Sequence, residues 1–409
     1  MEVTLNRRLA LSVLRNVRAT GRMNSLSPCE IACPSPAPAQ RWTHASADLS
    51  SLGIGWSFTQ DRPFELAVGR ADLRVRSSWA RNTVYERGLP DLPARAVSTG
   101  VSIVCLELLF VVLAKGLGTI EHVLLGYELC GTYARDADDP RSGPVAYGVS
   151  PATSVTRIER FIDSCDRTWG ISRARDNLAY VRDNAWSPME AIIAAFAMLP
   201  AYELGYDLGP VVLNRRERVS DGTGDGNTTG TRVPDLMFEG SAVGFNYEGF
   251  EHFDLGRLVR AARNVEVDPG NAHAGEELAL ATESVRAKYV DDARRDRELG
   301  AQGLTVFRAT KEDLYARGGL DRLMRLSMDA LERGSGRELG EQSVALRNAL
   351  LAKLRQEAIW AMLPGSLGRR SWRAKSQRKG RIRAAMAAAE AEAEAWLNAG
   401  APGGELIER

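Results

Sequence analysis

Two short apolar segments near the middle of the chain constrain its fold more than any other feature. Residues 232–238 (RVPDLMF) and 242–247 (AVGFNY) have the composition of β-strands, and the Glu-Gly-Ser between them is typical of a turn. The pattern predicts a β-hairpin whose first strand carries one acid, Asp235. Side chains alternate between the faces of a strand, so Asn246 and Glu248 are expected to point to the same side of the second strand.

These residues are of the types that a hard divalent cation prefers as ligands. Mg²⁺ or Mn²⁺ binds oxygen donors, and Asp235, Glu248 and the carbonyl of Asn246 supply them. His252, four residues after Glu248, is suited to act as a general base, a proton donor or a phosphate contact. Because a bound metal ion both activates water and stabilises charge on phosphate, the set predicts a site that hydrolyses phosphodiesters.

A charged helix further along the chain supplies more candidates for the same site. Asp292 and Asp296 lie about one turn apart on a helix expected over 285–300, so they share a face. Asp296 is expected to orient the site. The neighbouring Arg294 and Arg295 are expected to contact DNA.

Glu190 lies in the first turn of an apolar helix. Ser187 at the N-cap, Pro188 at the first helical position and Glu190 at the third form a strong helix start. Glu190 is therefore interpreted as a capping residue first and a catalytic or metal-site residue second. The other candidates have structural interpretations as well: Asp235 can cap a turn, the Phe-flanked His252 can pack in a core, and the charged helix face can simply be solvated.

Taken in this order, the residues resemble the PD-(D/E)xK restriction-endonuclease-like superfamily, in its branch near the very-short-patch repair endonucleases and their uncharacterised bacterial relatives. That branch has a helix with an early Glu, a strand with the metal-binding Asp, a strand of the type E-x-D-G-x-x-H, an Arg/Asp-rich helix, and a Gly before an apolar strand. The matching positions in this chain are Glu190, Asp235, residues 246–252, residues 294–296 and residues 303–307.

The resemblance implies an α/β fold. It implies a restriction-endonuclease-like core, a mixed sheet flanked by helices, with a small N-terminal α+β module and a helical C-terminal tail. It also implies Mg²⁺-dependent cleavage of DNA, with Asp235 as the main metal ligand. Two positions depart from the family pattern: Asn246 stands where most relatives have an acid, and Glu248 replaces the lysine of the superfamily name. The repair endonucleases use a backbone carbonyl at the position of Asn246, so a metal site is still expected.

Shifts in composition divide the chain into four expected segments. Residues 1–60 include a Ser/Pro/Ala-rich stretch and are expected to be a loosely ordered leader, and residues 61–135 a small α+β module suited to recognition. A loop at 136–144, rich in Asp, Pro and Gly, is the best expected boundary. An endonuclease-like domain is expected over 150–330, and a helical, basic tail over 340–409.

The other segments exclude several classes of protein. The apolar run at 101–114 is too short for a membrane span and contains Glu107, so a buried helix and no membrane association are expected. The Asp/Gly-rich stretch at 221–226 has Arg232 where an EF-hand needs Glu, so a flexible hairpin loop is expected. The five cysteines are scattered and odd in number, which favours a reducing cytoplasm over a disulfide framework or a zinc site.

The distribution of charge points to a polyanion-binding tail. The formal net charge is +1, but residues 369–383 alone carry eight Lys and Arg and no acid, so the remainder of the chain carries −7. A basic segment of this kind binds the phosphates of DNA without sequence specificity. The DNA contacts expected in the tail are Arg369, Arg370, Trp372, Arg373, Lys375, Arg378 and Lys379.

The leading interpretation is a cytoplasmic, metal-dependent DNA endonuclease or nicking enzyme. The alternative is a non-catalytic DNA-binding or regulatory protein on a decayed nuclease scaffold. A third interpretation is a protein-interaction partner in a defence or toxin–antitoxin system. It follows from the 61–135 module, which resembles the region before such nuclease domains in some bacterial proteins and also the antitoxin family of abortive-infection systems. That resemblance implies recognition of DNA or of a protein partner.

Overall fold

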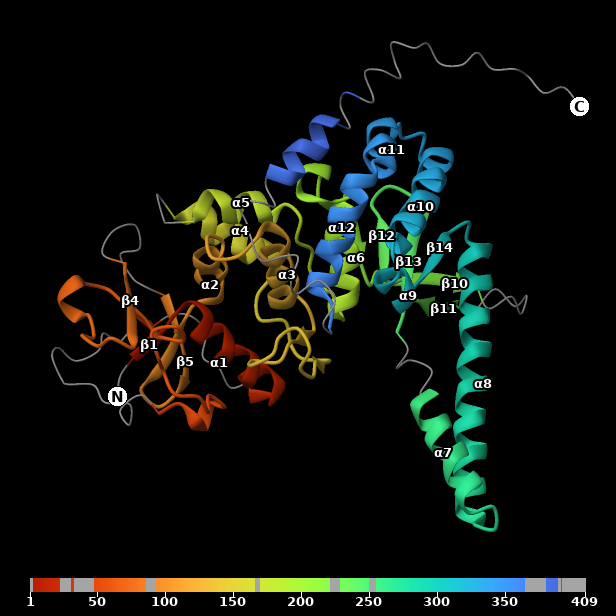
Figure 1. Ribbon diagram of the computed structural model, residues 1–409, viewed down its shortest axis with the longest axis horizontal. Coiled ribbons are helices and arrows are strands. Elements are labelled where there is room, and N and C mark those ends of the chain that lie inside the picture. The colour runs from red at the N-terminus through yellow and green to blue at the C-terminus, as the bar shows by residue number, and fades with distance from the viewer. Residues whose placement is uncertain are drawn as a thin grey trace, which may run out of the picture. The chain divides into compact units, whose positions relative to one another are not determined.

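A computed structural model describes residues 3–22, 31–32, 48–85, 93–165, 170–220, 229–249, 255–364, 380–388 and 391. The chain divides into two compact units, Met1–Ala195 with Met362–Ser366 and Phe196–Ala361 with Leu367–Arg409 (Figure 1). Helix α6 (Pro188–Met198) carries the chain from the first unit into the second. Within the described residues, no helix is long and apolar enough to cross a membrane.

A mixed sheet of six strands, in the order β2-β5-β6-β1-β3-β4, forms the base of the first unit. Its strands are β1 (Val3–Leu5), β2 (Ile31–Ala32), β3 (Phe64–Val68), β4 (Ala80–Val84), β5 (Pro93–Ser98) and β6 (Val101–Val104). A small hairpin of β7 (Tyr133–Ala134) and β8 (Ala146–Tyr147) lies apart from it. The helices are α1 (Arg7–Ala19), α2 (Leu106–Leu113), α3 (Thr119–Cys130), α4 (Val155–Ser164) and α5 (Ile171–Leu178), with short 3₁₀ turns η3 (Ser50–Leu52) and η4 (Ala71–Leu73).

The start of the chain belongs to this core, so the expected loosely ordered leader at 1–60 is wrong for residues 3–19. Strand β1 lies inside the sheet, parallel to β6 and antiparallel to β3. Helix α1 buries Leu9, Val13 and Val17, which recur at helical spacing. The arginines between these buried residues suggested a charged leader when only the sequence was considered. The Pro-rich stretch at 33–47 lies outside the described residues.

The apolar run at 101–114 forms two elements rather than the one helix expected. Residues Val101–Val104 are strand β6, and the Cys105 Sγ accepts a hydrogen bond from Leu108 N at 3.4 Å to begin α2. The β-branched Val101, Ile103 and Val104 favour the strand. A continuous apolar run cannot show where a buried strand passes into a buried helix.

The loop at 136–144 is present, but it is not the domain boundary expected from the sequence. Asp136 Oδ1 accepts hydrogen bonds from Asp138 N and Asp139 N, which closes the turn. The chain then returns to the first unit, where α4 and α5 pack against α2. The first unit therefore continues to Ala195.

The second unit contains a mixed sheet of four strands in the order β14-β13-β12-β9. The strands are β9 (Val211–Leu213), β12 (Leu236–Phe238), β13 (Val243–Glu248) and β14 (Thr305–Thr310), and a separate hairpin joins β10 (Glu217–Ser220) to β11 (Thr229–Arg232). Strands β9, β12 and β13 form an antiparallel meander, and β14 is parallel to β13. A mixed sheet flanked by helices confirms the general α/β class.

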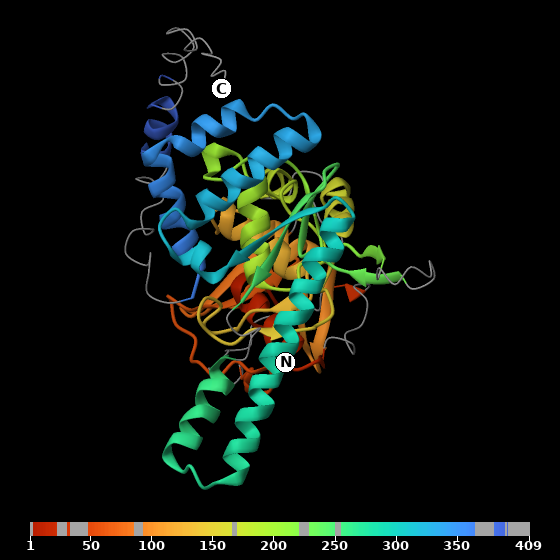
Figure 2. The same cartoon turned by 90° about the vertical axis from the view of Figure 1, so that its right-hand side faces the viewer.

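Helices connect and cover this sheet. They are α7 (Leu255–Val267), α8 (Ala272–Ala301), α9 (Lys311–Tyr315), α10 (Gly319–Ser335), α11 (Gly340–Arg347) and α12 (Ala349–Met362), with a short 3₁₀ turn η5 (Ala201–Glu203). Figures 1 and 2 show α8 running past the sheet, with α7 beside its first half. Helix α10 packs on β13 and β14, and the ring of Phe245 contacts those of Phe238 and Phe307.

Candidate functional site

Asp235 and Asn246 lie opposite each other at the end of the β12–β13 hairpin. The pairing of Leu236 with Phe245 places Asp235, one residue before β12, across from Asn246. Asp235 N donates a hydrogen bond to Asn246 Oδ1 at 3.2 Å, and Tyr247 N donates one to Asp235 Oδ2 at 2.6 Å. The structure therefore brings together two of the residues that the sequence placed in the site.

Glu248 lies on the same face of β13 as Asn246, two residues further along. Its Oε1 is 3.1 Å from Arg308 Nη1 and 3.6 Å from Arg295 Nη2. Arg308 is paired with Asn246 in the parallel β13–β14 ladder, so it shares this face of the sheet. Arg295 comes from α8. Two guanidinium groups from different elements thus meet one carboxylate.

Two further acids complete the charge pairing. Asp292 Oδ1 lies 3.4 Å from Arg295 Nη2, and Asp296 Oδ2 accepts a hydrogen bond from Arg308 Nε at 2.9 Å. Asp292, Arg295, Glu248, Arg308 and Asp296 form a row of alternating charges, which we call the charge row. Burial lowers the pKa of Arg308, but its hydrogen bond to Asp296 and the charge of Glu248 together raise the pKa by more than burial lowers it. The net shift is upward, so the guanidinium stays protonated.

The side chains at the expected metal site contact other protein groups. Glu248 Oε1 lies close to two arginines, the side-chain oxygen of Asn246 accepts the Asp235 N–H, and one oxygen of Asp235 accepts the Tyr247 N–H. Among the described residues, no group of three or more His, Cys, Asp or Glu side chains is placed to hold a metal ion. The described side chains of this site do not by themselves form a Mg²⁺ or Mn²⁺ site. His252, the other expected member, lies outside the described residues.

Glu190 has the capping role that was expected first. Its backbone N–H donates to Ser187 Oγ at 3.2 Å, and its Oε2 accepts a hydrogen bond from Trp186 N at 3.0 Å. Both hydrogen bonds stabilise the start of α6, although Glu190 accepts from Trp186 N rather than from the N-cap residue Ser187. Glu190 belongs to the first unit, whereas the charge row belongs to the second.

The remaining expected DNA contacts divide into two groups. Arg294 is exposed on α8. The expected contacts of the tail, Arg369, Arg370, Trp372, Arg373, Lys375, Arg378 and Lys379, lie outside the described residues, as does the loop at 221–226.

Two arginines of the second unit were missed by the sequence reasoning. Arg308 was expected in a strand, but only the pairing of β14 with β13 places it beside Glu248. Arg232 was considered only as the wrong residue for a calcium loop. Its Nε donates to Glu298 Oε2 at 2.6 Å and its Nη1 to Asp291 Oδ1 at 3.1 Å, which fastens the β10–β11 hairpin to α8. Alternation along β14 was the only signal for Arg308.

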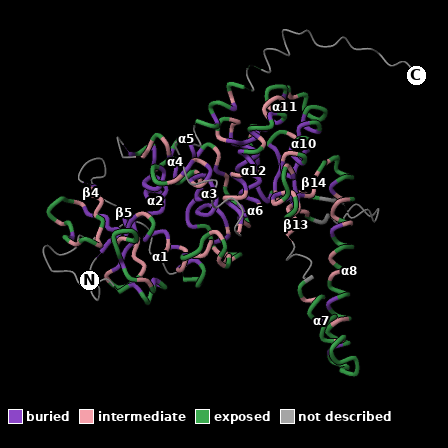
Figure 3. Tube along the Cα trace, in the orientation of Figure 1, coloured by how far each residue is buried: buried purple, intermediate pink, exposed green. Residues whose placement is uncertain are grey.

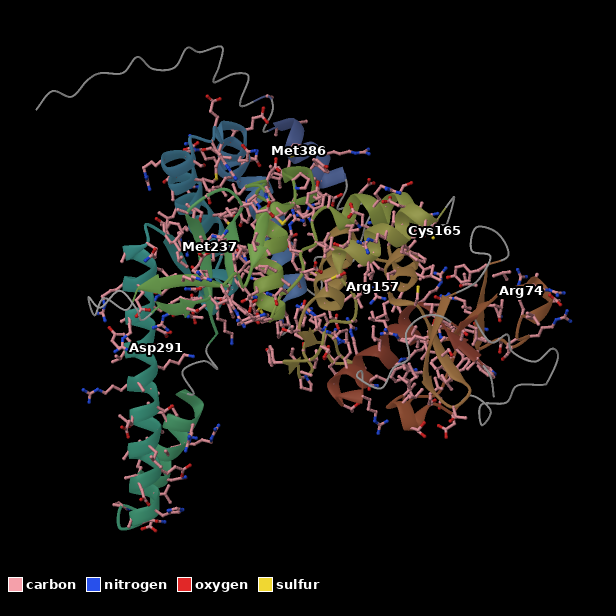
Figure 4. All side chains as sticks on the ribbon, turned by 180° about the vertical axis from the view of Figure 1, so that it is seen from behind. Arg74, Arg157, Cys165, Met237, Asp291 and Met386 are labelled. Atoms are coloured by element: carbon pink, nitrogen blue, oxygen red, sulfur yellow. The ribbon has the colours of Figure 1, made fainter. Side chains whose placement is uncertain are left out.

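A cluster of exposed arginines lies on the first unit, where the sequence reasoning named no candidates. Arg74 and Arg76 flank the buried Val75 in the extended segment before β4. Asn82 holds that segment in place, because its Oδ1 accepts from Val75 N and its Nδ2 donates to Val75 O, both at 2.9 Å. Arg81 precedes Asn82. Figure 4 labels Arg74 on this unit.

None of Arg74, Arg76 and Arg81 forms an ion pair with a described residue, whereas the nearby Arg70 is paired with Asp72 at 2.9 Å. We call these three residues the arginine cluster. Arg81 lies in β4 opposite Glu65 and interacts with its charge, but at a distance longer than an ion pair. Exposed guanidinium groups without ion pairs suit the binding of phosphate groups.

Comparison of the chain with protein-family models, with curated proteins and with solved structures found no match.

Proposed function

We propose that this protein binds nucleic acid, and that its second unit is a nuclease-related scaffold in which paired charges take the place of a metal site. The observation that carries this choice is the pairing of Glu248 with Arg295 and Arg308. A divalent cation at Glu248 would have to displace two guanidinium groups that remain charged at any physiological pH. Cleavage of DNA through Asp235 and Glu248 is therefore not expected.

The relation to nucleases is supported by the order of elements in the second unit. Helix α6 is followed by the β9–β12–β13 meander, by α8 and by the parallel β14. Asp235 lies next to the second of these strands, and Asn246 and Glu248 lie on the third. The order of these residues along the chain supports the relation to the PD-(D/E)xK superfamily, although the resemblance implies an Asp inside a strand and Asp235 lies one residue before β12.

Binding to nucleic acid is supported by two basic regions. One is the arginine cluster, which is exposed and without ion pairs among the described residues. The other is the segment 369–383, which has eight Lys and Arg and no acid. Residues 369–379 of this segment lie outside the described part of the chain, and Arg381 is paired with Glu357 at 3.5 Å. Basic groups in such regions neutralise phosphates and make binding strongly dependent on salt.

A second candidate function is the metal-dependent endonuclease that the sequence favoured. The observation that favours it is the shared face of Asp235, Asn246 and Glu248 at one end of the hairpin. Both candidates bind DNA, so only the requirement for metal and the fate of the DNA separate them.

One experiment compares the two. Purified full-length protein is incubated with supercoiled plasmid in EDTA, in Mg²⁺ and in Mn²⁺, and each mixture is analysed by gel shift and, after removal of protein, for nicked or linear DNA. The proposal predicts binding in all three conditions and intact plasmid. Cleavage that needs metal and is lost in Asp235→Ala would establish the endonuclease instead, and a plasmid that is neither shifted nor cut would contradict both.

A further inference from the structure

Helices α7 and α8 form an antiparallel hairpin within the second unit. Helix α7 packs on the first half of α8, and this contact buries the small side chains of Ala261, Ala274 and Ala281. The second half of α8 carries Asp292 and Arg295 of the charge row. Figures 1 and 2 show that the hairpin extends beyond the four-stranded sheet, and Figure 3 shows it largely exposed.

Both helices of this hairpin expose large apolar side chains. On α7, Val259 is 58 % exposed, and on α8 Leu280 is 55 %, Tyr289 66 % and Val290 47 % exposed. A helical hairpin that remained in water would have polar residues at such positions. Val259 and Leu280 lie on the part of the hairpin where the two helices pack on each other, whereas Tyr289, nine residues after Leu280, lies on the opposite face of α8. Exposed apolar side chains on both helices of a projecting hairpin are typical of an interaction surface.

The two helices also carry opposite charge. Helix α7 has Arg257, Arg260 and Arg263 against a single acid, whereas residues 272–284 of α8 have only Glu276, Glu277 and Glu283 as charged groups when His273 is neutral. No ion pair joins the three arginines to any described residue. Among the glutamates, only Glu276 has a described partner, with His273 at 3.7 Å. A basic helix and an acidic helix thus lie side by side without neutralising each other.

We propose that the α7–α8 hairpin is a self-association surface, on which the hairpin of a second copy of this chain packs. In a two-fold arrangement, α7 of each copy faces the acidic half of α8 of the other, so one surface serves both partners. The four helices form a small bundle that covers Val259 and Leu280. Charge complementarity favours a second copy, because its hairpin offers an acidic helix to α7 and a basic helix to α8, whereas nucleic acid could match only the basic helix.

Charge-reversed variants of the full chain test this. One carries Arg257→Glu, Arg260→Glu and Arg263→Glu. The other carries Glu276→Lys, Glu277→Lys and Glu283→Lys. Sedimentation velocity is measured over a range of concentrations for the unmodified protein, for each variant alone, and for an equimolar mixture of the two variants.

The unmodified protein is expected to be a dimer, and each variant alone a monomer because its two helices carry the same sign. The mixture is expected to form a heterodimer, because the acidic hairpin of one variant meets the basic hairpin of the other. A matched control reverses Arg322, Arg325 and Arg333 on α10, outside the hairpin, and is expected to remain a dimer.

Leu280→Glu provides a second variant that alters a single exposed residue, with far-UV circular dichroism as a check of helix content. The dissociation constant of its dimer is expected to be about ten-fold higher than that of the unmodified protein. A monomeric unmodified protein at all concentrations would overturn the proposal. So would dimers that persist in both reversed variants, or well-folded reversed variants that fail to associate when mixed.

Discussion

The arginine cluster gives the sharpest quantitative expectation. Replacing Arg74, Arg76 and Arg81 with Ala removes three exposed guanidinium groups that have no ion pairs among the described residues. Each phosphate contact contributes about 0.9 to the slope of log affinity against log salt concentration, so the triple variant should lose about 2.7 from that slope. Between about 50 and 200 mM salt, the unmodified protein should therefore lose about 40-fold more affinity than the variant.

The assay is fluorescence anisotropy with a labelled DNA duplex, repeated at several salt concentrations for each protein. A matched control replaces Arg322, Arg325 and Arg333 of α10 with Ala, which lowers the net charge by the same amount at another surface. Its slope is expected to stay close to that of the unmodified protein. The reasoning is refuted if the slope is unchanged in the cluster variant, or if the control loses as much slope as the cluster variant.

Three further changes test the fold around the sites. Burial, with a contribution from Arg173, lowers the pKa of His122 from 6.5 to about 4, so His122 stabilises the fold above pH 6.5 and this contribution is lost as the pH falls to 4. Urea unfolding at each pH should show a loss of about 3 kcal/mol in this window that His122→Gln lacks. In the same assay, Glu248→Gln should lower the free energy of unfolding by only about 1–2 kcal/mol, because Arg295 remains paired with Asp292 and Arg308 with Asp296. An unchanged free energy of unfolding would contradict the pairing of Glu248 with the two arginines. Gly244→Ala would bring a Cβ against the Leu236 carbonyl oxygen, so thermal unfolding should show a loss of about 2 kcal/mol, and an unchanged melting temperature would refute the packing.

The local elements of the second unit could be predicted from the sequence because their signals are local. The two apolar segments with a turn between them predicted a hairpin, and the structure has β12 and β13 there. The first strand is shorter than the expected 232–238, because β12 begins at Leu236 and leaves Asp235 before the strand. The Ser187–Pro188–Glu190 start predicted the cap of α6, which the hydrogen bonds confirm.

The parts that were missed depend on contacts distant in sequence. Strands β1 and β9 have three residues each and are stabilised by neighbours in their sheets rather than by their own pattern. The role of Arg308 depends on the register between β13 and β14, which are separated in the chain by helices α7 and α8. The sequence alone does not show which charged groups lie near Glu248. Only the tertiary structure shows that Arg295 and Arg308 pair with its carboxylate.

The most direct test of the central claim is whether Asp235 and Glu248 hold a metal ion. Mn²⁺ can be titrated into the full-length protein and the free ion followed by electron paramagnetic resonance, in parallel with Asp235→Ala and Glu248→Ala. If Glu248 is committed to Arg295 and Arg308, all three proteins should bind the same amount of Mn²⁺ with the same affinity. One tight site in the unmodified protein that both variants lack would contradict the account.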